Sequence, residues 1–284
     1  MERVTVRAFL RELLDEWSKD DALTLGAALA YYTIFSMAPL LVLVIAIAGL
    51  VFGRAAAQGE IVAQIQGMLG ASGAELIESM IERASEPASG VVATVVSLAT
   101  MLFGASGVFG QLQGSLNQIW GADATRRSGV KGRLQRRAAS FSMILGIGFL
   151  LLVSLAISAL ISGLHGFIDA YFTLPVEIFA LANFSLSLVI VMALFATIFK
   201  LLPDARIEWR DVWLGAAVTA LLFTIGKSLI GIYLGRAGVT SVYGAAGSLV
   251  LVLLWVYYSA QLLFLGAEFT EVYSRRFGSR RNAE

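Results

Sequence analysis

The chain has 284 residues, of which 58% are hydrophobic and only 14% are charged, and its formal net charge is +1. Soluble domains carry about a quarter charged residues, so this composition excludes an ordinary soluble protein and indicates a polytopic membrane protein. With no cysteine and a single histidine, His165, the chain excludes disulfides and thiol catalysis, and we expect no metal site and no cofactor. Its basic residues are scattered among the connections between apolar stretches, so no nucleic-acid partner is expected.

Residues 1–22 are predicted to form an amphipathic helix. Apolar residues recur there at i, i+3 and i+4 spacing, while Arg3, Arg7 and Arg11 take the opposite face. A helix of this kind suits the cytoplasmic interface of a membrane. Packing against the cytoplasmic ends of the other helices is the alternative, and the pattern leaves both open. The apolar face comprises Val6, Phe9, Leu10, Leu13, Leu14 and Trp17.

Six apolar stretches follow, and each exceeds the ~20 residues that a helix needs to cross a ~30 Å hydrocarbon core. The chain is therefore predicted to be all-α, a single integral-membrane domain (1–284) built as a bundle of six transmembrane helices. The predicted spans are 23–53, 91–119, 138–163, 176–202, 212–234 and 245–269.

The positions of lysine and arginine predict the orientation of these spans. Of the 21 basic residues, 17 lie in the N-terminal segment and in the segments after the second, fourth and sixth spans. By the positive-inside rule both termini are expected in the cytoplasm. The charged segment 1–22 precedes an apolar run that is too long for a signal peptide, so the first span is expected to remain as an anchor.

The external segment 54–90 is predicted to contain two short amphipathic helices that separate near Ser72 and Gly73. Its glutamates make this segment acidic, which is typical of a solvated face on surface helices. The alternative is a cover over an external vestibule. The glutamates are Glu60, Glu75, Glu78, Glu82 and Glu86.

Small residues predict how the spans pack. Glycines recur every three or four residues along one face of the second span, at Gly104, Gly107, Gly110 and Gly114. Such spacing lets helix backbones approach closely in lipid. The tetrapeptide Leu-Gly-Ala-Ala occurs at 25–28 and again at 214–217, each time after an aspartate, which suggests a parallel internal repeat or chance similarity.

Two residues inside spans invite a functional interpretation. Pro39 removes a backbone hydrogen bond in the first span, and the resulting kink serves either a gate or a fixed bend. Lys227 is the only charge well inside a span, about 22 Å from the inner boundary if the fifth span begins near Val212. At that depth it either snorkels to the outer interface or faces a cavity and binds an anionic headgroup or substrate. Asp169 and Tyr243 are its expected neighbours.

A second polar set lies in the inner half of the first, second and sixth spans. These groups could line a cavity that opens to the cytoplasm, and they could equally serve as interface anchors, a common role of tyrosine. The set comprises Tyr31, Tyr32, Gln111, Asn117, Gln261 and Glu268.

No phosphate-binding loop of the GxxxxGK[ST] type, no HExxH and no serine elbow is present, so we expect neither an ATPase nor another enzyme. The leading hypothesis is a transporter or translocase of a lipid or a small amphiphilic or anionic molecule. The alternative is a scaffold that does not transport and organises partner proteins or the envelope. Membrane lipids are the expected partners, and the sequence leaves open whether the protein is a homo-oligomer.

Seven short motifs along the chain carry a resemblance to a known family. They are LAYYTIFSMAPLL at 29–41, LNQIW at 116–120, LPD at 202–204, WRD at 209–211, YGAAGSL at 243–249, WVYYSAQ at 255–261 and GAEF at 266–269. They resemble the YihY/BrkB family of bacterial inner-membrane proteins over about 25–275. This resemblance implies six spans, and transport or lipid translocation has been suggested for the family. Members of the family have been labelled "ribonuclease BN", but a hydrolytic nuclease needs metal-binding carboxylates or paired histidines, which we do not find.

Overall fold

The computed structural model describes residues 6–85, 100, 107–122, 176–205, 207–236, 243 and 246–281. Every regular element within these ranges is a helix, which confirms the all-α class. The predicted third span at 138–163 lies outside the described residues, as do Gly104, Glu86 and Asp169. In chain order the helices are α1 (Val6–Lys19), α2 (Ala22–Phe52), α3 (Arg54–Ser85), a helix at 107–119, α6 (Val176–Leu201), α7 (Trp209–Arg236) and α9 (Gly247–Arg276).

Within the described ranges, three helices are long and apolar enough to cross a membrane. These segments are Ala22–Leu50 in α2, Trp209–Gly231 in α7 and Gly247–Arg276 in α9, and Ser187–Leu201 in α6 is a shorter apolar helix. The membrane class is therefore confirmed, while the number of six spans stays a prediction. The helix α9 continues to Arg276, seven residues beyond the predicted end of the last span.

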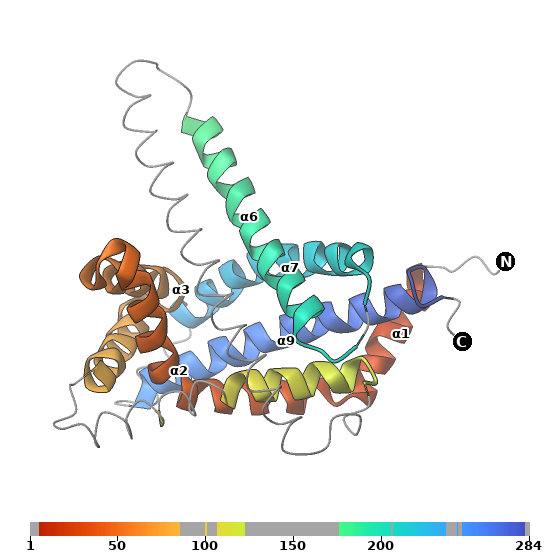
Figure 1. The fold of residues 1–284 in the computed structure, drawn as a ribbon, viewed down its shortest axis with the longest axis horizontal. Helices are drawn as coiled ribbons and strands as arrows, with labels where there is room; N and C mark the ends of the chain where they lie inside the picture. The colour runs from red at the N-terminus through yellow and green to blue at the C-terminus, as the bar shows by residue number, and fades with distance from the viewer. Residues whose placement is uncertain are drawn as a thin grey trace.

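The helix α9 lies between α2 and α7, with α1 near one of its ends and α3 near the other (Figure 1). Phe264 of α9, Phe199 of α6 and Leu116 of the helix at 107–119 are fully buried in one apolar cluster. Pro39 lies inside α2, and Figure 1 shows that this helix bends along its length.

Close contact between α7 and α9 depends on a reciprocal pair of glycines and threonines. Gly215 of α7 lies against Thr270 of α9, and Gly266 of α9 lies against Thr219 of α7. A Cβ atom at Gly215 would be 2.7 Å from the Cβ of Thr270, and one at Gly266 would be 2.8 Å from the Cβ of Thr219. Both threonine hydroxyls donate to the carbonyl four residues earlier, at 2.7 and 2.6 Å, so neither is left unsatisfied in this apolar contact.

The helix α3 caps the far end of the bundle and is broken at Gly70, where φ is 74°. Because glycine has no Cβ, it adopts this backbone conformation without strain. The break comes two residues before the predicted Ser72, and the second half of α3 then buries Ile77 and Ile81 against Ile45 of α2. The described glutamates Glu60, Glu75, Glu78 and Glu82 are all exposed.

Candidate functional site

A network of ion pairs joins α1 to the end of α9. The guanidinium of Arg275 lies 3.0 Å from Glu12, 3.2 Å from Glu16 and 3.4 Å from Glu271. Its side chain is only 30% exposed, so the charges are partly shielded from water and these pairs are stronger than ordinary surface pairs. We call this network the polar junction, and its members are Glu12, Glu16, Lys19, Asp20, Glu268, Glu271, Arg275, Arg276 and Arg280.

Apolar contacts hold the same two helices together. The ring of Phe9 meets Phe269 edge-on at 5.4 Å and lies 6.2 Å from Phe277, and Leu13 is buried. One face of α1 therefore packs against α9, as the second of the two predicted arrangements requires. The other face leaves an apolar stripe with two flanking arginines exposed, which is the pattern of a helix at a membrane interface. This exposed set is Val6, Arg7, Leu10, Arg11 and Leu14.

We predict that acid loosens the attachment of α1. The Lys19 ammonium donates a hydrogen bond to Glu16, and this bond together with Arg275 lowers the pKa of the Glu16 carboxyl below its ordinary 4.5. The stabilisation is present in full above pH 4.5 and is lost as the pH falls through the lowered native value. The protection of α1 amides against hydrogen exchange, taken relative to the intrinsic exchange rate at each pH, should fall in this acid range, and Glu16→Gln should remove that part of the pH dependence. Equal acid sensitivity in the Glu16→Gln protein would contradict the assignment.

Two carboxyl groups meet at the centre of the polar junction. Glu268 of α9 is fully buried, and neither of its oxygens has a hydrogen-bond partner of good geometry among the described residues. The carboxyl of Asp20, in the connection between α1 and α2, interacts with it. Burial raises the pKa of Asp20 above its ordinary value, and the nearby Glu16 acts in the same direction while Lys19 opposes it.

Hydrogen bonds also join the end of the helix at 107–119 to two neighbouring connections. Asn117 donates from its side-chain amide to Asp204 at 3.1 Å and accepts from the Asp204 backbone N–H at 2.7 Å. Gln118 donates to the carbonyl of Asp20 at 2.7 Å. The end of the helix at 107–119 is thereby tied both to the connection after α6 and to the polar junction.

The first turn of α7 is fixed in the same region. Asp211 is buried, and one of its oxygens accepts from the backbone N–H and the hydroxyl of Ser279, at 2.9 and 2.6 Å. Arg280 lies over the ring of Trp120 at 5.9 Å, and Lys200 lies over Trp209 at 5.6 Å while it donates to the carbonyl of Ile207.

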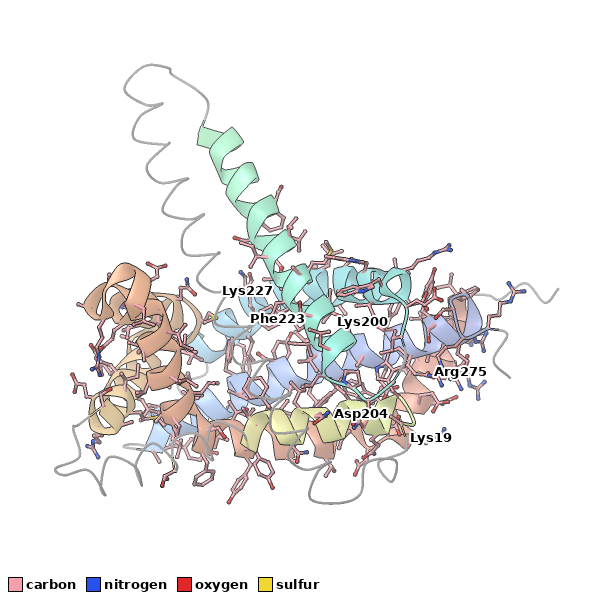
Figure 2. All side chains as sticks on the ribbon, in the orientation of Figure 1. Lys19, Lys200, Asp204, Phe223, Lys227 and Arg275 are labelled. Atoms are coloured by element: carbon pink, nitrogen blue, oxygen red, sulfur yellow. The ribbon has the colours of Figure 1, made fainter. Side chains whose placement is uncertain are left out.

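These contacts bring three of the basic segments, together with the described end of the second predicted span, to one end of the described bundle. The N-terminal helix meets the C-terminal end of α9 through Glu12 and Arg276. The end of the second predicted span meets the connection after α6, and the start of α7 meets the segment after α9. Figure 2 shows Lys19 and Arg275 together at this end, whereas Lys227 lies farther along the bundle.

The predicted inner polar set is divided among different surroundings. Gln261 of α9 lies against Gly26, with a weak hydrogen bond of 3.4 Å from its amide to the carbonyl of Ala22. Tyr31 and Tyr32 are 60% and 44% exposed on α2, where Tyr31 contacts the ring of Phe35. Gln111 bonds within its own helix, to Ser115, and Asn117 and Glu268 lie in the contacts given above. Only Glu268 belongs to the polar junction.

Lys227 of α7 is exposed, and so are Ile225 and Leu229, at 59% and 60%. The adjacent Gly226 faces Tyr258 and Leu262 of α9 instead. Tyr243, an expected neighbour, is also exposed. Whether the Lys227 ammonium meets a cavity or the interface stays a prediction.

The glycines of the second predicted span differ in their surroundings. Gly107 faces Ser36 and Tyr32 of α2, with 3.3 Å between a Cβ built at the glycine and the hydroxyl of Ser36. Gly110 and Gly114 have no described side chain within 4 Å of such a Cβ. Their predicted packing role therefore stays untested, and the closest glycine contacts among the described residues lie elsewhere, at Gly215 and Gly266.

Several residues of the site were not singled out from the sequence. Arg275 counted only as an orientation charge, and Asp204 and Asp211 were noted only within short motifs. Asp20 carried no signal, because its partner Glu268 is 248 residues away. Among the described residues, no group of three or more acidic or histidine side chains is arranged to hold a metal ion.

Comparison with known proteins places this arrangement in a family. The family model described as "Virulence factor BrkB" matches residues 13–284. A UPF0761 membrane protein of Chromohalobacter salexigens is 27% identical over 279 residues, covering 97% of this chain and 64% of the relative. A UPF0761 membrane protein of Pseudomonas aeruginosa is 27% identical over 91% of this chain and 61% of its own length.

A relative of similar length carries a different name. The putative ribonuclease-like protein YfkH of Bacillus subtilis is 22% identical, covering 95% of this chain and 96% of the relative. By contrast, the chain spans about six-tenths of the length of the two UPF0761 relatives. No solved structure matches the chain.

Proposed function

The chain belongs to the virulence factor BrkB family, and we propose that it is a transporter or translocase of a lipid or a small amphiphilic or anionic molecule in the bacterial inner membrane. The observation that carries this proposal is Glu268, a fully buried carboxyl in a helix that is able to cross the membrane. Ionisable groups in such helices are costly and mark pathways for ions or substrates more often than they stabilise the fold.

We further propose six spans with both termini in the cytoplasm. Three of the four basic segments that the positive-inside rule assigns to the cytoplasm, and the helix end that leads into the fourth, gather at one end of the described helices. The acidic helix α3 lies at the opposite end, which fits an external cap. This agreement between charge bias and spatial arrangement supports the orientation.

A scaffold without transport activity is the second candidate. The tight glycine–threonine contact between α7 and α9 favours it, because a solid interface leaves no path between these two helices. For the ribonuclease name of the Bacillus subtilis relative, we propose no counterpart in this protein. The described carboxylates of the polar junction are mostly paired with arginine and lysine, whereas a hydrolytic nuclease uses carboxylates that are free to bind metal ions.

We predict that Lys227→Ala lowers the transport of an anionic lipid by about tenfold, since one charge-assisted contact contributes about 1.5–3 kcal/mol. The measurement is the movement of a fluorescent phosphatidylglycerol analogue between the leaflets of liposomes that contain the purified full-length protein. Ser228→Ala is the matched control, because Ser228 is the exposed neighbour on the same helix. Equal flux in the wild-type and Lys227→Ala proteins would remove the role of Lys227. Flux no greater than that of protein-free liposomes would favour the scaffold.

A further inference from the structure

The charges of the polar junction do not balance. Among the described residues, five carboxylates and four cations are connected by ion pairs or by direct electrostatic interaction, so full ionisation of this set leaves one excess negative charge in a partly buried region. An excess buried charge is costly unless a cation or a proton neutralises it. The carboxylates are Glu12, Glu16, Asp20, Glu268 and Glu271, and the cations are Lys19, Arg275, Arg276 and Arg280.

The excess falls on one particular residue. Each of the four cations is paired with Glu12, Glu16 or Glu271, and no ion pair reaches Glu268 among the described residues. Glu268 is fully buried with both oxygens unpartnered, and the charged group that it meets at close range is another carboxyl, Asp20. Two adjacent carboxyls, of which the buried one has no cation of its own, are accommodated when they share one proton.

Among the residues that the structure describes, the other elements around Glu268 contribute no compensating charge. From α1 it faces Glu16, and along its own helix it faces Glu271, both of which repel a carboxylate. On α7 the buried Asp211 is already engaged by Ser279. The described end of the helix at 107–119 contributes a neutral amide, Gln118, which binds the backbone of Asp20 rather than its carboxyl.

We propose that Asp20 and Glu268 form a proton-binding site, in which a proton taken from cytoplasmic water occupies a carboxyl oxygen of the pair. Resting on the transport function proposed above, we assign this proton as the coupling ion. The site joins two separate parts of the fold, since Asp20 belongs to the connection between α1 and α2 whereas Glu268 belongs to α9. Movement of α1 and α2 away from α9 would admit water to Glu268, and the carboxyl would then ionise and release its proton.

The backbone around Asp20 is held in a defined position. Asp21, the next residue, has a φ of 52°, which is rare for a residue other than glycine and is tolerated best by aspartate and asparagine. Gln118 holds the carbonyl of Asp20 at 2.7 Å. The two carboxyls are thus held together by the fold, and opening the site requires a change in this connection.

Infrared spectroscopy of the purified full-length protein in lipid nanodiscs tests the site directly. At pH 7 the wild-type protein should show the C=O stretching band of a protonated buried carboxyl, and Glu268→Gln should remove that band. The control Glu82→Gln, on an exposed face of α3, should keep it. Asp20→Asn removes a carboxyl that repels the ionised form of Glu268. We therefore expect the band to disappear at lower pH in Asp20→Asn than in the wild type, by about one pH unit or more. A band unchanged by Glu268→Gln would overturn the proposal, and so would a titration unaffected by Asp20→Asn, which decides the matter if Glu268→Gln fails to fold.

Flux in liposomes under an imposed pH gradient tests the coupling separately. With the phosphatidylglycerol analogue as probe, we expect the wild-type flux to change at least severalfold with the gradient and the Glu268→Gln flux to ignore it. If the wild-type flux does not depend on the pH gradient, the proposed coupling is wrong. The proton-binding site is then tested by the infrared result alone. Absence of any flux would instead count against the transport function, and the proton site would still stand or fall on the infrared band.

Discussion

Gly215→Ala is expected to destabilise the protein by about 2–3 kcal/mol, although it adds a single methyl group. The new Cβ would lie 2.7 Å from the Cβ of Thr270, which is far inside the normal contact distance and close to the backbone of α9. Relief therefore requires a shift of the helices, because Thr270 is fully buried and cannot turn aside. The measurement is the midpoint of thermal unfolding in detergent, together with the yield of monodisperse protein.

A matched control lies on the same helix. Gly231 has no described atom within 4 Å of a Cβ built there, so Gly231→Ala should leave the unfolding midpoint within a degree or two of the wild type. The exchanged pair Gly215→Ala with Thr270→Gly should recover much of the stability lost in Gly215→Ala, since the removed side chain makes room for the added methyl group. Equal midpoints for Gly215→Ala and Gly231→Ala would show that the α7–α9 contact is not the tight one described.

Local physics explains why the helices could be predicted. A membrane-spanning helix satisfies its own backbone hydrogen bonds and needs only a sufficient apolar length, so the start of α2 at Ala22 and of α7 at Trp209 lie within three residues of the predicted spans. The end of α9 was missed for a related reason. Glu271 and Arg275 interrupt the apolar run, yet the helix continues because Arg275 pairs with Glu16 of α1 and with Glu271 on its own helix.

Partners that are distant in sequence could not be predicted. Asn117 and Asp204 are 87 residues apart, and nothing in either local pattern indicates that one binds the other. The spacing of glycines has the same limit as a predictor. It shows that small residues line one face of a helix, but it does not show which element packs against that face. The second predicted span has the more regular glycines, but among the described residues the closest contacts occur at Gly215 and Gly266.

The Leu-Gly-Ala-Ala repeat carried more information than its length suggested. Its two glycines, Gly26 and Gly215, both lie against side chains of α9, namely Gln261 and Thr270. Both follow an aspartate near the start of a helix, and both helices leave from the end of the bundle that holds the polar junction. The structure thus gives the two copies equivalent packing roles on opposite sides of one central helix, whether or not they share an origin.

Arg275→Ala is expected to release α1 from α9 at neutral pH. The substitution removes the cation that Glu12, Glu16 and Glu271 share and leaves each with one other ion pair, and removing such a shared partner from a partly buried network costs about 2–3 kcal/mol. Hydrogen exchange of α1 peptides should accelerate by about a hundredfold, since 1.4 kcal/mol corresponds to a factor of ten. Arg281→Ala, which removes an exposed arginine six residues later, should leave the exchange of α1 unchanged.

Acid should partly rescue Arg275→Ala, because protons can replace the missing cation. In the wild type the hydrogen bond from Lys19 and the contact with Arg275 lower the pKa of Glu16, so without Arg275 this carboxyl should accept a proton at higher pH. Relative to the intrinsic exchange rate at each pH, the protection of α1 should therefore rise in the variant as the pH is lowered toward the ordinary range of a carboxyl group, whereas the protection in the wild type should not rise. Protection in the variant that stays low at every pH would show that Arg275 holds α1 by packing rather than by neutralising charge, and the excess charge assigned to Asp20 and Glu268 would then lose its physical basis.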